Sequence, residues 1–403
     1  MSFEMLFFVI ACLIPSFLIS FLATAAMRKL APRWGLIDQP AQRKVHITPT
    51  PLGGGVGIWL GVIIPIVCAQ LIALVLVKSG SNPSWIPAEL IVHLDGVLYR
   101  SEQLWMVLAG GTVLAVMGLL DDKLNISWKP RLIIQLLVAG GLVMGGIRGS
   151  LFIQQPWIGM LLTVAWIIVL VNSLNFLDNM DGLTSGIGLI AAILFAIIML
   201  RFTGEPRWLV AGVLLVLAGA IAGFLCHNWP PAKIFMGDSG SYFIGLILST
   251  MTILGTFYPG TTPTGDVIVN RHVILAPLCI LAIPLYDFCT VMIIRLKEGR
   301  SPFHADKSHF SHRLVELGLS KRATVLTIHL ATLTTGIGGL ILYEVSSWSA
   351  ALLVILMILC VLSIVTILEN VGRKNRECVS SVKKNRHSRF ELRRLQQRPL
   401  SSG

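Results

Sequence analysis

Apolar runs of about twenty residues recur along the chain, and short polar segments that carry most of the charges separate them. A run of this length can cross a lipid bilayer as an α-helix. The pattern predicts an all-α polytopic membrane protein with about eleven spans. Their approximate ranges are 5–27, 53–77, 104–120, 132–147, 157–175, 183–200, 208–226, 234–257, 272–294, 323–343 and 348–368. The eighth and ninth follow the pattern least closely, because Met236–Ser241 is polar and Pro277 and Pro284 interrupt the ninth.

The composition agrees with a membrane protein. Of 403 residues, 55% are hydrophobic and 13% are charged, whereas a soluble domain has roughly 25% charged residues. The seven cysteines are scattered and form no CxxC pair. This distribution favours apolar packing over disulfides or a thiolate metal site.

Positive charge is unevenly distributed between the two sets of segments that alternate along the chain. Of 32 Lys and Arg residues, 26 lie in the set that includes the C-terminal tail. The positive-inside rule therefore places the N-terminus outside and the C-terminus in the cytoplasm. The first span, with no preceding Lys or Arg, is expected to be an anchor. Residues 1–370 form the predicted membrane domain, and the basic tail 371–403 is expected to contact anionic lipid rather than nucleic acid.

Half of the acidic residues gather at the predicted cytoplasmic face. Asp121 and Asp122 end the third run, in MGLLDDKLNISWKPR. Adjacent carboxylates at a membrane edge are costly unless a cation shares them. On a helix the two would point about 100° apart, yet at its end both could reach one ion or phosphate. The alternative is a solvated acid pair beside Lys123.

Two amides and two acids recur at regular steps in NSLNFLDNMDGL. Asn172, Asn175, Asp178 and Asp181 follow at steps of three residues, which would place them on one stripe of a helix. Such a stripe suits a hydroxyl-rich ligand and a hard cation. The alternative is a polar helix cap surrounded by water.

Three further segments supply candidate groups. In KIFMGDSGSYFIG, a Gly-Asp-Ser-Gly turn presents Asp238 for contact with metal or phosphate. The loop RLKEGRSPFHADKSHFSHRL is basic, which fits a diphosphate or a sugar, although a solvated basic loop is an equal alternative. The first cytoplasmic loop, RKVHITPTPLGGGVG, is basic and rigid, which fits a lipid headgroup, although positive-inside topology could also explain its charges. Their candidate residues are Arg300, His304, His309 and His312 in the first of these loops, and Arg43 and His46 in the second.

Carboxylates, cations and apolar spans together indicate phosphoryl transfer from a soluble nucleotide to a lipid. Mg²⁺ would neutralise the diphosphate, and basic side chains would take up the remaining charge. The chain has no GxxxxGK[ST] motif, which argues against ordinary ATP hydrolysis.

These motifs, in this order, resemble those of the polyprenyl-phosphate N-acetylhexosamine-1-phosphate transferases of glycosyltransferase family 4. These membrane enzymes start lipid-linked glycan and cell-wall synthesis. The resemblance covers nearly all of 30–320 and rests on Asp121-Asp122, NSLNFLDNMDGL, FMGDSGS, SPFHADKSHFSH and RKVHITPTPLGG. The N-acetylglucosamine branch usually has HxHH in the last loop, whereas this chain has HFSH, with Ser311 at the middle histidine.

The resemblance implies a multi-pass enzyme of the cytoplasmic membrane that uses a UDP-N-acetylhexosamine and polyprenyl phosphate and releases UMP. It implies Mg²⁺, replaceable by Mn²⁺, and leaves a homodimer open. The implied catalytic residues are Asp121, Asp122 and Asp238, with Asp121, Asp178 and Asp238 as metal ligands. The implied substrate contacts are Asn172, Asn175, Asp178, Asp181, Lys123, Arg300, His304, His309, His312, Arg43 and His46.

Three other classes of protein fit less well. A CDP-alcohol phosphotransferase needs DGxxAR…GxxxDxxxD, but LTSGIGL follows Asp181-Gly182. A secondary transporter would place its acids near the bilayer midplane and often has inverted repeats. A membrane scaffold that binds nucleic acid through its tail would leave the paired acids unexplained.

Overall fold

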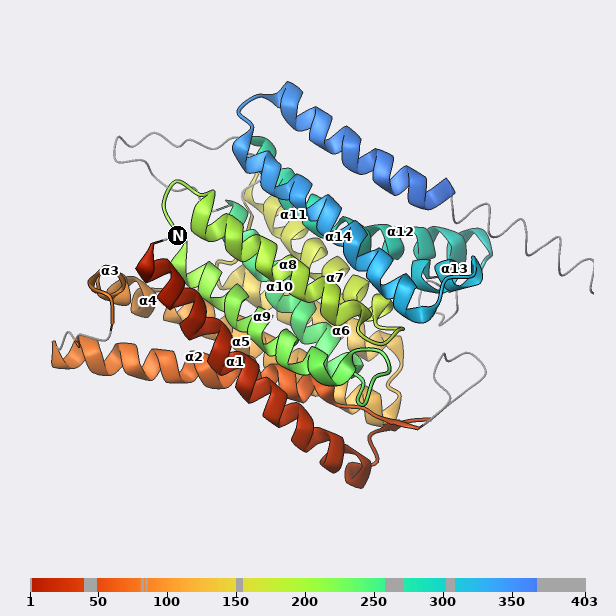
Figure 1. Ribbon diagram of the computed structural model, residues 1–403, viewed down its shortest axis with the longest axis horizontal. Coiled ribbons are helices and arrows are strands. Elements are labelled where there is room, and N and C mark those ends of the chain that lie inside the picture. The colour runs from red at the N-terminus through yellow and green to blue at the C-terminus, as the bar shows by residue number, and fades with distance from the viewer. Residues whose placement is uncertain are drawn as a thin grey trace, which may run out of the picture.

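A computed structural model describes residues 2–39, 49–80, 83, 86–149, 155–257, 271–301 and 309–367. These residues form a bundle of long helices that run mostly along one direction (Figure 1). The helices are α1 (Phe3–Leu30), α2 (Gly54–Ser79), α3 (Ala88–Ile91), α4 (Leu94–Tyr99), α5 (Ser101–Leu124), α6 (Trp128–Met144), α7 (Pro156–Leu177), α8 (Leu183–Arg201), α9 (Trp208–Asn228), α10 (Gly237–Phe257), α11 (Ala276–Ile280), α12 (Ala282–Lys297), α13 (Phe310–Glu316), α14 (Lys321–Glu344) and a last helix, Trp348–Ile367. Two 3₁₀ turns, Ala31–Trp34 and Arg271–Leu275, and two short strands, β1 (Ile37–Asp38) and β2 (Thr50–Pro51), complete the described elements.

The helices confirm a polytopic helical membrane protein. Within the described ranges, nine helices are long and apolar enough to cross a membrane. The expected span 132–147 is the 17-residue helix α6. The eighth expected span, 234–257, is the regular helix α10, although its first residues are polar. The count of eleven and the orientation of the termini stay predictions, as does the division at residue 370, since the tail lies outside the described residues.

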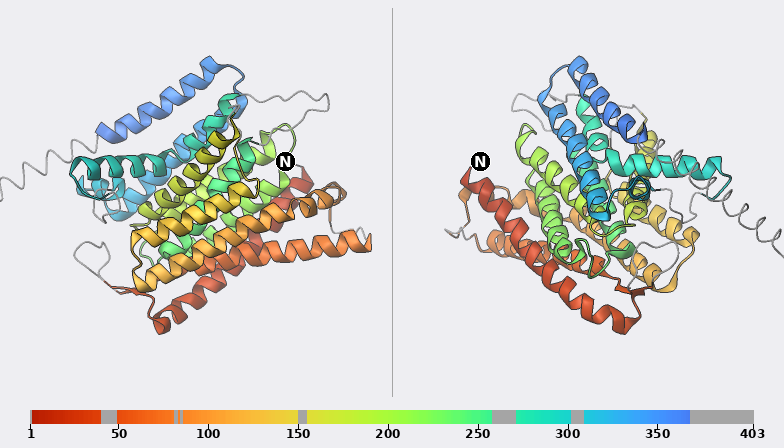
Figure 2. Two further views of the ribbon diagram at one scale, coloured as in Figure 1. Left: turned by 180° about the vertical axis from the view of Figure 1, so that it is seen from behind. Right: turned by 45° about the vertical axis from the view of Figure 1, so that its right-hand side comes forward.

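The ninth expected span is two helices rather than one. The segments Arg271–Ile280 and Ala282–Lys297 meet at an angle of 70°. Pro284 cannot donate a backbone hydrogen bond to the carbonyl of Ile280, so the helix breaks one turn before it. Figure 2 shows that α12 runs across the direction of its neighbours. The bend brings α12 beside α7 and α14.

Helix α10 lies at the centre of the bundle and contacts α2, α5, α7, α8 and α9. Its start approaches two glycines closely. A Cβ atom on Gly118 of α5 would lie 2.4 Å from the Asp238 backbone, and one on Gly55 of α2 would lie 2.2 Å from the Gly240 nitrogen. Only hydrogen fits at both positions, so these glycines fix Asp238 against the end of α5.

The short strands β1 and β2 form an antiparallel pair that the sequence did not predict. Ile37 pairs with Pro51 in the antiparallel register of β1 and β2. The Phe235 N–H donates to the Pro51 carbonyl at 2.9 Å, and the Gly54 N–H donates back to Phe235 at 2.9 Å. Strands of two residues are too short to leave an alternating pattern. This strand pair ties the residues before α10 to the start of α2.

Candidate active site

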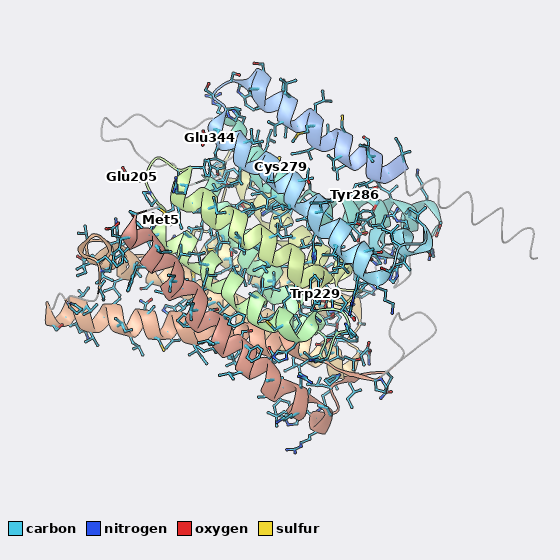
Figure 3. The ribbon with its side chains drawn as sticks, in the orientation of Figure 1. Met5, Glu205, Trp229, Cys279, Tyr286 and Glu344 are labelled. Carbon is cyan, nitrogen blue, oxygen red and sulfur yellow. The ribbon has the colours of Figure 1, made fainter. Side chains whose placement is uncertain are left out.

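Asp121 and Asp238 come together at one end of the bundle, and an arginine lies between them. Arg131, in the first turn of α6, donates to Asp121 Oδ2 at 2.5 Å and to Asp238 Oδ2 at 3.3 Å. It also lies 3.4 Å from the Tyr242 hydroxyl. Figure 3 labels Trp229, which follows α9, at this end. In the sequence, Arg131 was only one of the basic residues that set the predicted orientation. No sequence pattern near Arg131 indicates that it contacts Asp238, which lies 107 residues further along the chain.

Asp122 faces α10, while its neighbour Asp121 faces α6. The Asp238 N–H donates to Asp122 Oδ1 at 3.0 Å. The other oxygen, Oδ2, is buried and makes no hydrogen bond to the described part of the chain. Gly237 adopts a left-handed φ of 72°, and a Cβ there would lie 2.3 Å from Asp122. The adjacent acids therefore point to different helices, as their helical spacing predicts, and the Gly-Asp turn packs directly on one of them.

The polar face of α7 reaches the same place. The Asn175 amide donates to Asp238 Oδ1 at 2.8 Å and to the Ser241 hydroxyl at 3.1 Å. Asn172 lies one turn earlier and donates to Gln135 of α6 at 2.7 Å. The structure therefore confirms the placement of both asparagines on one helical face, with Gln135 as a partner that the sequence did not reveal.

The expected helical stripe is wrong beyond Leu177, where α7 ends. Residues 178–182 form a loop in which Gly182 has a φ of 73°. Residues at and after the end of α9 hold this loop in place. Asp181 accepts from the Ala232 N–H at 2.9 Å, and the Gly182 N–H donates to Asn228 Oδ1 at 2.9 Å. Asp and Asn favour such turns over a helix interior.

Asp178 shares the electrostatic environment of this carboxylate cluster. Burial raises the pKa of its carboxyl group to about 8, and the charges of Asp238 and Asp181 add to the rise. Like charges in close proximity favour binding of a cation or a proton. The unpartnered oxygen of Asp122 is a further group that a cation would satisfy. The described residues thus fit a hard cation, although no three of their acidic, His or Cys side chains converge as a preformed metal site.

The start of α13, which carries His309 and His312, contacts a buried acid. Asp287 of α12 is fully buried and lies 2.9 Å from His309 Nδ1, while its other oxygen accepts from the Phe310 N–H at 2.6 Å. The His309 ring also meets Phe176 edge-on, with ring centroids 6.1 Å apart. His309 is therefore oriented by protein groups. Asp287 belongs to none of the sequence motifs and is identified only by these contacts.

Ser311, the departure from the family motif, connects the first turn of α13 to the 178–182 loop. Its hydroxyl donates to Asn179 Oδ1 at 2.6 Å, and Asn179 donates in turn to the Phe176 carbonyl at 3.1 Å. Ser311 is fully buried. The residue that replaces the middle histidine thus joins α13 to the 178–182 loop.

The remaining predicted residues have less defined places. His312 is buried, with its ring centroid 6.3 Å from that of His309. Lys123 is exposed at the end of α5, and Arg300 pairs with Glu298 after α12. The candidates Arg43, His46 and His304 lie outside the described residues. Arg295, the first of the basic residues in the motif RLKEGRSPFHADKSHFSHRL, is buried with its guanidinium 5.1 Å from the centre of the Phe176 ring.

Two replacements of Asp287 are expected to distinguish its effect on the orientation of His309 from its effect on stability. In Asp287→Asn one oxygen still accepts from Phe310, but the charge beside His309 is lost, so kcat/KM should fall about tenfold to a hundredfold. Asp287→Ala leaves the Phe310 N–H buried without an acceptor and should lower the unfolding free energy by a further ~1–3 kcal/mol. Turnover and thermal unfolding of both variants check this. Equal turnover in Asp287→Asn and the parent would contradict the role.

A double-mutant cycle is expected to reveal the coupling between Ser311 and Asn179. The net value of a buried hydrogen bond is about 1 kcal/mol, which corresponds to about fivefold in kcat/KM. Ser311→Ala and Asn179→Ala should each lower activity, and the double variant should lose less than the product of the two. Strictly multiplicative losses would mean that the contact does not matter for activity.

The fold and the site define a multi-pass membrane protein with a carboxylate-rich site at one end of its bundle. Residues 104–256 match the sequence model described as Glycosyl transferase family 4. The chain is 31% identical over 360 residues to a Bacillus subtilis protein named probable undecaprenyl-phosphate N-acetylglucosaminyl 1-phosphate transferase, covering 87% of this chain and 89% of that one. It is 33% identical to the decaprenyl-phosphate N-acetylglucosaminephosphotransferase of Mycobacterium tuberculosis, with 78% and 77% covered.

An Escherichia coli relative is named undecaprenyl-phosphate alpha-N-acetylglucosaminyl 1-phosphate transferase. It is 31% identical over 361 residues, which are 85% of this chain and 87% of the relative. The chain therefore belongs to the polyprenyl-phosphate N-acetylhexosamine-1-phosphate transferases of glycosyl transferase family 4, and the resemblance seen in its motifs is confirmed.

Proposed function

We propose that the protein transfers N-acetylglucosamine-1-phosphate from UDP-N-acetylglucosamine to a polyprenyl phosphate, as the first membrane step of lipid-linked glycan or cell-wall polymer synthesis. The observation that carries the proposal is the convergence of Asp121, Asp122, Asn175 and Asp238 from three helices at one end of the bundle. The names of the relatives supply the sugar and the lipid. Family membership favours this reaction over the CDP-alcohol phosphotransferase and transporter alternatives.

The proposed reaction balances without a further reactant. An oxygen of the lipid phosphate forms a bond to the phosphorus that carries the sugar. The bond from that phosphorus to the oxygen shared with the uridine phosphate breaks, and UMP leaves. The products are polyprenyl diphosphate-N-acetylglucosamine and UMP. The cytoplasmic membrane is the proposed location, since the site lies at the end with most of the basic residues.

Asp121, Asp178 and Asp238 would hold Mg²⁺ or Mn²⁺. These ions prefer carboxylate oxygens, and Arg131 alone supplies too little charge for the cluster. When bound, the ion would neutralise the diphosphate and orient it for displacement. Asp122 would position or deprotonate the lipid phosphate, because it lies directly beside the proposed metal ligand Asp238 and accepts from its backbone N–H.

Other groups would bind the rest of the substrates. The amides and the loop after α7 would contact the nucleotide, with Lys123 near the end of α5. The histidine loop would bind the diphosphate or the sugar, because it is joined to the nucleotide loop through Ser311. The assigned residues are Asn172, Asn175, Asp181 and Lys123 for the nucleotide, His304, His309, His312 and Arg300 for the diphosphate or sugar, and Arg43 and His46 for the lipid headgroup.

The reaction is tested by UMP release from purified protein in detergent with polyprenyl phosphate, UDP-N-acetylglucosamine and Mg²⁺. Reactions without lipid and with other UDP-sugars are the controls. Release that requires lipid and is fastest with this sugar supports the proposal. Folded protein that releases no UMP with any UDP-sugar would overturn it.

Metal removal is expected to abolish UMP release, and Mg²⁺ or Mn²⁺ should restore it. The pKa of Asp178, raised to about 8, means that a proton competes with the ion at neutral pH. The Mg²⁺ concentration for half-maximal rate should therefore fall as the pH rises from about 6 to 8. Titration of EDTA-treated protein at several pH values measures this. Full activity in EDTA would contradict a metal requirement and leave the lipid dependence to be judged separately.

A further inference from the structure

A cavity that contains two arginines lies at the end of the bundle opposite to the carboxylates. It has a volume of about 330 Å³ and opens between α4, α5, α9 and α10. Figure 3 labels Met5 and Glu205 at this end. The volume lies within the range of small-molecule sites. Most of the wall is apolar, with Leu104, Val213 and Leu254 among the lining residues.

Two arginines line this otherwise apolar cavity, Arg100 at the end of α4 and Arg207 just before α9. This is unusual for the chain, because only 6 of its 32 Lys and Arg residues fall in the segments on this side. Among the described residues that line the cavity there is no carboxylate. The polar contributions to the wall are thus predominantly cationic.

Arg207 is fixed in place by backbone groups. Its guanidinium donates to the Gly255 carbonyl at 2.8 Å and to the Leu254 carbonyl at 3.4 Å, near the end of α10. Burial lowers the pKa of the guanidinium, Tyr343 of α14 opposes this, and the charge of Arg100 adds to the lowering. Arg100 donates to Gln103 at 3.3 Å. Two like charges beside one partly desolvated cavity favour an anionic ligand.

The chemistry of the wall indicates which anion fits. Guanidinium groups bind phosphate oxygens in a fork geometry, whereas the apolar residues require an alkyl chain. Trp208 lines the cavity and packs edge-on against Phe8, with ring centroids 4.9 Å apart. Tryptophan is enriched at the level of lipid headgroups. An anion with an attached alkyl chain would contact both the arginines and the apolar residues of the wall.

We propose that this cavity binds the phosphate headgroup of an anionic phospholipid between Arg100 and Arg207, with part of an acyl chain along the apolar wall. The site lies at the opposite end from the proposed transferase chemistry and does not depend on that proposal. The lipid belongs to the leaflet at the end of the bundle that carries few basic residues.

The test uses full-length purified protein and native mass spectrometry with phosphatidylglycerol, phosphatidylcholine and inorganic phosphate as separate probes. The parent protein should retain phosphatidylglycerol in preference to phosphatidylcholine. Arg100→Gln removes one exposed cation and should weaken phosphatidylglycerol binding about tenfold. Gly96→Phe should fill the cavity and weaken binding similarly, because Gly96 lines it and no atom lies within 4 Å of its Cβ position.

Arg201→Gln is the matched control, since Arg201 is exposed at the same end but does not line the cavity. It should bind phosphatidylglycerol like the parent. Equal affinity in the parent, Arg100→Gln and Gly96→Phe would overturn the proposal, as would equal binding of the two lipids. Saturable binding of inorganic phosphate without lipid would assign a simple anion site and overturn the lipid as the occupant. Unchanged melting temperatures confirm that the variants are folded.

Discussion

Asp238→Asn is expected to lower the rate of UMP release by about a hundredfold or more while the protein remains folded. The Asp238 carboxylate contacts Arg131 of α6 and Asn175 of α7, at 3.3 and 2.8 Å. Asparagine has nearly the same shape, but it lacks the charge that a metal ion would need. The backbone N–H at this position still donates to Asp122, so the start of α10 should keep its place.

The control for this variant is Glu205→Gln, which removes an exposed acid between α8 and α9. It should leave UMP release and thermal unfolding unchanged. A metal titration of Asp238→Asn adds a second readout, because a lost ligand should raise the half-maximal Mg²⁺ concentration. Near-normal turnover in Asp238→Asn would contradict the proposed metal role. A large loss together with a lowered melting temperature would show a structural role instead.

Gly118→Ala is expected to lower both activity and stability, although Gly118 carries no functional group. The new Cβ would lie 2.4 Å from the Asp238 backbone, and backbone cannot swing away as a side chain can. Such overpacking typically costs about 1–3 kcal/mol. Displacing Asp238 from Asp121 and Asp122 by a fraction of an ångström should reduce UMP release by about a hundredfold.

Gly140→Ala is the matched control, since Gly140 lies within α6 and no atom lies within 4 Å of its Cβ position. This variant should keep full activity and gain about 0.5–1 kcal/mol, because alanine loses less backbone entropy in a helix. Thermal unfolding and UMP release of both variants are compared under the same conditions. Parent-like activity in Gly118→Ala would mean that α5 and α10 separate without effect on the site.

Elements that depend on local pattern were predictable. The apolar runs place the long helices, because each helix satisfies its own backbone hydrogen bonds within the bilayer. The carboxylates of the Asp121-Asp122 pair, the α7 segment and the Gly-Asp turn were expected at one end, because each follows or begins a span at that end. The continuation of the helical stripe from Leu177 to Asp181 was mispredicted, since partners at Asn228 and Ala232 hold these residues in a loop.

The sequence by itself determined a polytopic helical protein with an acidic site at one end, and its motifs identified the family. The tertiary structure decided which groups meet: Arg131 with Asp121 and Asp238, Asp287 with His309, and Ser311 with Asn179. It also decided the 70° bend at α12 and the cavity at the far end. The physical reason is range. A span is stabilised by hydrogen bonds four residues apart, whereas these contacts join residues on different helices and loops, and no short sequence pattern records how those elements pack.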